Sequence, residues 1–112
     1  IHVVTARQCR EQGFAAAALQ ALEILASRAP RIHVDFDIDV ISRAEFPAAP
    51  GARPGGISAS EFFAATRAIL RHPKVVSVDL TEFDPSLDAK DLSALTVARW
   101  FMEVLAGFAW RG

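Results

Sequence analysis

The stretch RIHVDFDIDV (residues 31–40) decides the fold class, because it combines an apolar strand pattern with regularly spaced acids. Asp35, Asp37 and Asp39 occupy every second position. Side chains two residues apart on a strand face the same side, so a strand running to Val40 would place three carboxylates together. Such an arrangement is unfavourable unless something binds the negative charge. We therefore expect this strand to lead into a functional site.

The chain around this stretch alternates between strand and helix patterns. Alternation of this kind predicts a parallel sheet with right-handed helical crossovers. The 112 residues suffice for one domain, so we expect an α/β fold in the order β-α-β-α-β-α over residues 1–112. The predicted strands are 1–5, 31–40 and 74–83, and the predicted helices are 14–29, 57–73 and 92–110.

Local signals support this division. Ser58 followed by Glu61 is a capping box, which marks the start of a helix. The segment 41–56 holds three prolines and three glycines, which predicts a long loop, and long loops inside a domain are usually functional or disordered. The last helix is apolar around much of its circumference, so we expect it to be buried.

Composition narrows the range of partners. The formal net charge of −1 gives no indication of a nucleic-acid or anionic-membrane partner. No uninterrupted apolar run approaches the ~18 residues of a membrane span, and the N-terminus lacks the pattern of a signal peptide. Cys9 is the single cysteine, so an internal disulfide is impossible. We expect a cytoplasmic protein that does not contact membranes.

Three acids are expected at one edge of the sheet. Asp37 and Asp39 end one predicted strand, and Glu82 ends the next. Ligands bind at the carboxyl ends of parallel strands, and carboxylate oxygens suit Mg, Ca or Mn. Asp35 lies in mid-strand, where we expect it to bond to backbone or an arginine. The three histidines lie at strand starts or a helix end, away from this edge: His2, His33 and His72.

The segment HVDFDIDVISRAEFPAAPGARPGGIS resembles the C-terminal half of the arginase–agmatinase–formimidoylglutamase (ureohydrolase) family. That family has an apolar strand with an F-D-x-D motif, a Pro/Gly loop, and P-G-G-[LI]-[ST] opening a helix. The segments VVSVDLTEFDPSLD and SALTVARWFMEVLAGF resemble the parts that follow. The similarity covers nearly all of the chain in order, which makes the combination of motifs specific. It implies a C-terminal piece of the three-layer α/β/α arginase-like fold.

The resemblance also implies residue roles. Asp37 and Asp39 match two carboxylate ligands of the family's binuclear Mn²⁺ centre, and Glu82 matches the acid that faces the substrate's guanidinium or amidine group. Family members hydrolyse a linear C–N bond of arginine, agmatine or formimidoylglutamate, with water activated by the two metals. The implied partner is therefore a small guanidino or amidine molecule.

Two departures from the family pattern matter. Ser42-Arg43 stands where the family usually has Asp-Pro, which favours formimidoylglutamate slightly over agmatine or arginine as substrate. The family's other metal ligands lie upstream in G-G-D-H and D-A-H-x-D segments that this chain lacks. We therefore expect a partial metal site, no activity from this chain alone, and either a homo-oligomer or pairing with a missing N-terminal portion.

Two alternatives remain open. The pattern VDFDIDVIS also fits haloacid-dehalogenase-like phosphatases, with Asp37 as nucleophile and Asp39 as general acid/base. Against that hypothesis, Lys74 and Lys90 are the two lysines and neither is well placed. The other alternative is a non-catalytic α/β interaction module whose apolar edge pairs with a partner.

Overall fold

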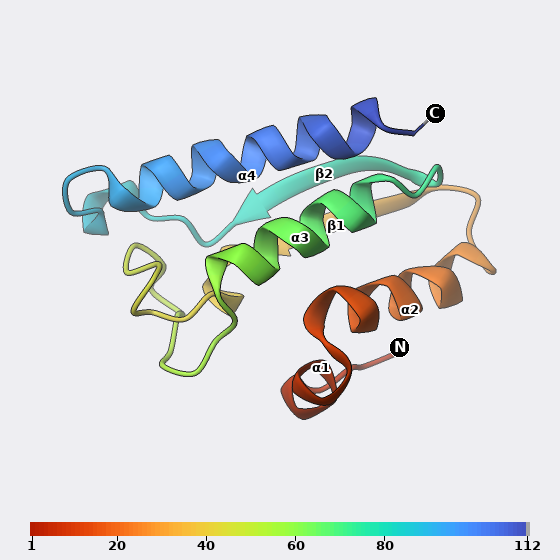
Figure 1. Cartoon of the computed structure of the whole chain (residues 1–112), viewed down its shortest axis with the longest axis horizontal. Helices are drawn as coiled ribbons and strands as arrows, with labels where there is room; N and C mark the ends of the chain where they lie inside the picture. The colour runs from red at the N-terminus through yellow and green to blue at the C-terminus, as the bar shows by residue number, and fades with distance from the viewer. Residues whose placement is uncertain (112) are drawn as a thin grey trace.

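A computed structural model describes residues 1–111 of the chain and shows an α/β arrangement (Figure 1). Within these residues one sheet is formed, from strands β1 (Ile32–Asp37) and β2 (Val75–Thr81), which pair in parallel. The predicted class, parallel strands joined by a helical crossover, is confirmed. The helices are α1 (Ala6–Gln12), α2 (Phe14–Ala26), α3 (Ala59–Leu70) and α4 (Leu92–Ala109), with 3-10 turns η1 (Ile38–Val40) and η2 (Pro85–Leu87).

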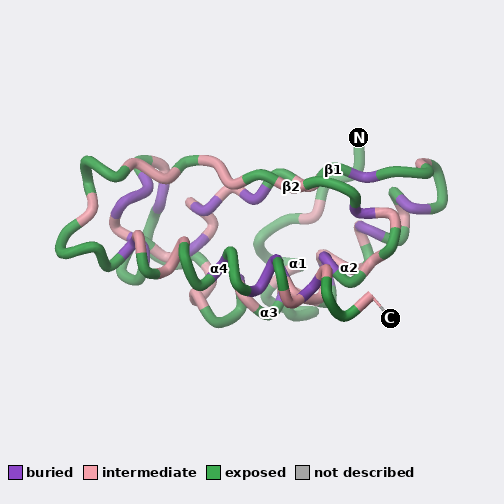
Figure 2. Tube along the Cα trace, turned by 90° about the horizontal axis from the view of Figure 1, so that it is seen from above, coloured by how far each residue is buried: buried purple, intermediate pink, exposed green. Residues whose placement is uncertain are grey.

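The described chain forms two layers. Figure 2 shows the two strands along one side of the molecule and the helices along the other. The core lies between them, where Phe36 of β1 meets Phe62 of α3 and Trp100 of α4 edge to face, with ring centroids 5.9 and 5.6 Å apart. Aromatic pairs in this geometry stabilise a core beyond the area they bury. These contacts fix α3 and α4 against one face of the sheet.

The other face of the sheet is polar and uncovered by any described element. Thr81 donates a hydrogen bond to Asp35 at 3.0 Å, and His33 lies 2.9 Å from the Ser77 hydroxyl and 3.4 Å from the Asp79 carboxylate. Asp35 therefore bonds to a threonine hydroxyl, and the expected backbone or arginine partner was wrong. Each cross-strand pair of this kind contributes about 0.2–1 kcal/mol to the stability of the sheet.

The predicted strand at residues 1–5 was wrong. No described strand includes these residues, and Ile1 and Val3 are largely exposed. A strand needs a neighbouring strand to accept its backbone hydrogen bonds, and neither described strand pairs with this segment. Thr5 instead caps α1 through a capping box with Gln8. The sequence signal for this short helix was missed.

Both remaining strands are shorter than predicted. β1 ends at Asp37, and Ile38–Val40 turns into η1, so Asp37 and Asp39 are not alternate residues of one strand. The Asp37 side chain itself favours this turn, because it accepts a hydrogen bond from the Asp39 backbone N–H at 3.1 Å. β2 ends at Thr81, which leaves Glu82 one residue beyond the strand.

Helix α3 begins as its sequence predicts. The Ser58 side chain accepts from the Glu61 N–H, and the Glu61 carboxylate accepts from the Ser58 N–H. These bonds lower the pKa of Glu61, with the Ser58 backbone N–H as the largest cause. The Glu45 carboxylate of the preceding loop also accepts from the Ala59 N–H at 2.9 Å. The helix start is therefore fixed from both the helix and the loop.

Helix α4 is less buried than predicted. Trp100 and Val104 are buried, but Leu95 and Met102 are 67% and 59% exposed. By length and composition alone, α4 could cross a membrane, with mean hydropathy 1.3. It also carries Glu103, which forms ion pairs with two arginines. The described chain thus uses α4 to cover the sheet and leaves a second apolar face of the helix without a contact.

Candidate active site

The parallel register brings two of the predicted site residues together. Asp37 is the last residue of β1 and pairs with Thr81, the last residue of β2. Glu82 follows directly, so it lies next to Asp37 at the carboxyl end of the sheet, where α/β folds bind ligands. The backbone φ of Glu82 is 68°, a left-handed value that is uncommon for a residue with a side chain. Strained backbone of this kind collects at functional sites.

Asp39 joins the same group through η1. Burial raises the pKa of Asp39, and the negative charges of Asp37 and Glu82 raise it further, while Arg53 acts in the opposite direction. Asp37 and Glu82 therefore both lie close enough to Asp39 for their charges to disfavour its ionised form. A cation between them would remove this repulsion, because an opposite charge favours the ionised carboxylate.

The long Pro/Gly loop closes over these acids. It is neither disordered nor peripheral, because the side chains of Phe46, Ala48, Ala49 and Ala52 are fully buried. The Asp84 N–H donates to the Ala48 carbonyl at 2.9 Å, which ties the loop to the segment after β2. A long irregular segment with a packed interior is typical of a functional loop.

Gly51 and Arg53 are site residues that the sequence did not single out. A Cβ atom built on Gly51 would lie 2.0 Å from Asp39 Oδ2, so the loop backbone closes on this carboxylate as only glycine allows. Arg53 donates to the carbonyls of Pro50, Gly51 and Ala52 at 3.2, 2.8 and 3.0 Å and so holds the loop bend. Glycine enrichment was the available signal, but no pattern says which glycine touches an acid.

The acids do not form a complete metal centre by themselves. Within residues 1–111 no group of three or more His, Cys, Asp or Glu side chains is arranged to hold a metal ion. His33 faces Ser77 and Asp79 on the open face, and His72 accepts from the Lys74 N–H behind α3. The roles of Asp37, Asp39 and Glu82 therefore stay predictions.

Comparison with known proteins assigns the chain to a family. The family model described as "Arginase family" matches residues 1–107. The chain belongs to the arginase family. This arginase-family chain spans about a third of the length of the curated relatives it matches. Membership also removes the phosphatase alternative, and Lys74 agrees with this, because its ammonium group donates to the Ala26 carbonyl, far from the carboxyl end of the sheet.

Curated relatives of this arginase-family chain carry two names. Formimidoylglutamase of Bacillus subtilis is 26% identical over 96% of this chain and 34% of its own length. Formimidoylglutamase of Geobacillus thermodenitrificans is 36% identical over 82% of this chain and 29% of its own length. Agmatinase of Halalkalibacterium halodurans is 33% identical over 77% of this chain and 30% of its own length.

Solved structures share the fold. The crystal structure of formimidoylglutamase from Bacillus subtilis superposes with a TM-score of 0.91 at 26% identity, over 97% of this chain and 34% of that one. Trypanosoma cruzi formiminoglutamase, crystallised with Mn²⁺, gives a TM-score of 0.89 at 23% identity, over 99% of this chain and 37% of that one. The expected α/β arginase fold is thereby confirmed for the described part of the chain.

Proposed function

We propose that the protein carrying this chain hydrolyses a linear C–N bond of a formimidoyl or guanidino amino-acid derivative with manganese. The observation that carries the proposal is the convergence of Asp37, Asp39 and Glu82 at the carboxyl end of two parallel strands. Formimidoylglutamate is favoured over agmatine and arginine. Supporting this, formimidoylglutamases occur among the relatives, and Ser42-Arg43 replaces the usual Asp-Pro.

The residues present fit a hard dication. Asp37 and Asp39 offer oxygen donors, which suit manganese. The missing side chain of Gly51 leaves space for the Asp39 carboxylate beside the loop. Bound manganese would act as a Lewis acid and lower the pKa of a water molecule. Asp37 and Asp39 would hold the metal, and Glu82 would accept hydrogen bonds from the N–H groups of the amidine.

The rest of the site would come from outside this chain. The uncovered sheet face, the exposed segment Ile1–Val3 and the second face of α4 all favour packing against further structure. In the family pattern the histidine ligands precede the part matched here. We therefore propose that the chain acts with an N-terminal portion or within a homo-oligomer, and is inactive alone. A non-catalytic interaction module is the remaining alternative.

The test is a substrate assay on the complete protein. With manganese present, formamide release from formimidoylglutamate and urea release from agmatine and arginine are measured side by side. Asp37→Ala is expected to abolish release, because it removes a metal ligand. Asp35→Ala, two residues earlier on the open sheet face, is the matched control and is expected to keep wild-type turnover.

Unchanged turnover in Asp37→Ala would refute its role as a ligand. Absence of turnover of all three substrates by the wild-type protein would favour the interaction module. Formamide release identifies formimidoylglutamate as a substrate, and separate urea assays with agmatine and with arginine distinguish those two, since hydrolysis leaves the amidine carbon in formamide or in urea and frees the amine.

A further inference from the structure

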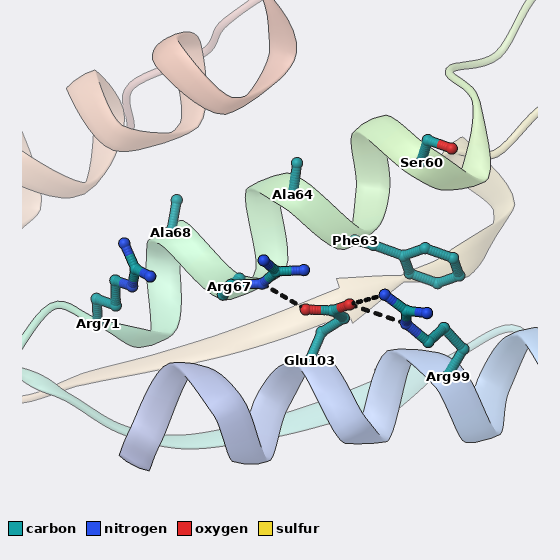
Figure 3. Close-up of a pocket in the computed structure, with 8 residues that line it drawn as sticks. All are labelled: Ser60, Phe63, Ala64, Arg67, Ala68, Arg71, Arg99 and Glu103. Atoms are coloured by element: carbon teal, nitrogen blue, oxygen red, sulfur yellow. Dashed lines mark hydrogen bonds and ion pairs between the residues drawn. The ribbon is translucent and has the colours of Figure 1, made fainter. Parts of the chain in front are cut away.

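A groove between α3 and α4 lies apart from the carboxylate site. Figure 3 shows side chains of both helices meeting in it, with the strands passing behind the helices. Its volume is about 370 Å³. It is lined by Ser60, Phe63, Ala64, Arg67, Ala68, Arg71, Arg99 and Glu103. The small alanine side chains leave the groove shallow and open, and the arginines make its lining positively charged.

A buried carboxylate organises two of the arginines. Glu103 is 3% exposed and accepts from Arg67 Nε at 2.5 Å and from Arg99 at 2.8 and 2.6 Å. Hydrogen bonding by Arg67 is the largest cause of the lowered pKa of Glu103, so this carboxylate stays ionised at neutral pH. The two guanidinium groups are thereby held in place from α3 and α4 before any ligand arrives.

The arginines of the groove retain N–H donors that are not used in hydrogen bonds to described residues. Within residues 1–111, Arg67 bonds through Nε alone, and Arg99 leaves Nη1 without a hydrogen bond. Arg71 follows the last residue of α3 and bonds to no carboxylate of residues 1–111, and its guanidinium lies 4.8 Å from the centre of the Trp110 ring. Three arginines against one glutamate give the groove a formal charge of +2. The ion pairs of Glu103 are enough to join α3 to α4. The additional arginine and the net positive charge are not needed for that structural role.

We propose that this groove binds a small dianion whose charge is carried by phosphate or carboxylate oxygens. A guanidinium presents two parallel N–H groups that match the spacing of such oxygens, and a fixed guanidinium loses less freedom on binding. The Ser60 hydroxyl at the N-terminal end of α3 supplies one further donor to the lining. Phosphate compounds and dicarboxylates share this chemistry, so the experiment separates them.

The test is a titration of the complete protein with sodium pyrophosphate and, separately, with glutarate. Heat of binding is recorded at fixed ionic strength, so that general screening stays constant. Saturable binding below about 1 mM is expected for one of the two anions. Arg71→Gln is expected to weaken it at least about tenfold, because a charge-assisted hydrogen bond is lost.

Arg28→Gln is the matched control, since Arg28 is an exposed arginine at the end of α2 that does not line the groove. It is expected to leave binding unchanged. Arg71 makes no ion pair with another described residue, so its loss should not unfold the protein, and thermal unfolding checks this. The proposal is overturned if neither anion binds saturably up to about 10 mM. It is also overturned if the two variants weaken binding equally.

Discussion

Glycine 51 shows how one residue without a side chain can define a site. The loop around it brings its backbone against the Asp39 carboxylate, and Arg53 holds the bend through three carbonyls. Gly51 needs no positive φ here, so the requirement is space rather than backbone freedom. This separates it from Gly13, whose φ of 87° serves the turn between α1 and α2.

Gly51→Ala is expected to weaken manganese binding by the complete protein at least about tenfold, the usual effect of disturbing a ligand's supports. The added Cβ would lie 2.0 Å from Asp39 Oδ2, so the carboxylate must move. Manganese activation curves of amidine hydrolysis measure the effect. Pro54→Ala, an exposed change in the same loop, is the control. Wild-type manganese affinity in Gly51→Ala would show that the contact has no role in metal binding.

At the scale of elements, α3 and α4 are joined by packing and by charge. Apolar residues of both helices cover β1, and Gly107 of α4 permits close approach, because a Cβ there would lie 2.5 Å from the Leu70 Cβ. Glu103 adds ion pairs to Arg67 of the neighbouring helix and to Arg99 of its own. A buried carboxylate is tolerated only with such partners.

Glu103→Gln is expected to lower the free energy of unfolding by about 1–2 kcal/mol at pH 7, because charge-assisted bonds become neutral ones. The pKa of Glu103 is lower in the folded chain than its ordinary 4.5. Its contribution is therefore complete above pH 4.5 and is lost as the pH falls through the lowered pKa. Urea unfolding at several pH values measures this.

The difference between wild type and Glu103→Gln should thus stay constant above about pH 5 and shrink below pH 4.5. Glu11→Gln, a change at an exposed glutamate of α1, is the control and should show neither effect. A difference that grows in acid would contradict the assignment of the ionised pair as the stabilising form.

At the scale of the whole molecule, the chain is a two-layer piece of a larger fold. One sheet face is polar and is covered by no element of residues 1–111, and apolar side chains of α4 such as Leu95 and Met102 are exposed. Exposed apolar side chains of this kind favour packing against further structure. The site is incomplete as well, since no group of three or more candidate metal ligands is arranged around an ion within residues 1–111.

The 112-residue chain alone is therefore expected to bind manganese weakly, at least about a hundredfold more weakly than the complete protein, and to show no turnover. Titration of manganese into each protein, followed by calorimetry, measures the ratio. Circular dichroism of the short chain confirms that it is folded during the experiment. Tight binding of two manganese ions by the short chain would contradict its description as part of a site.

The sequence determined the class of the fold and the residues worth testing. Alternation of strand and helix patterns predicted parallel pairing, and the capping box of Ser58 and Glu61 predicted where α3 begins. Acids near two strand ends, together with the motifs of one family, predicted Asp37, Asp39 and Glu82. These features depend on residues that are close in sequence. They can therefore be predicted from local backbone preferences and from the periods of 3.6 residues in helices and 2.0 residues in strands.

Only the tertiary structure decided the rest, because it depends on which segments become neighbours. Residues 1–5 have the composition of a strand but find no strand to pair with, so they form none. The contact of Gly51 with Asp39 and the ion pair of Arg67 in α3 with Glu103 in α4 join residues that no sequence period relates. The RIHVDFDIDV stretch identified the candidate acids from the sequence. The turn that follows Asp37 determined where each of these acids lies in the structure.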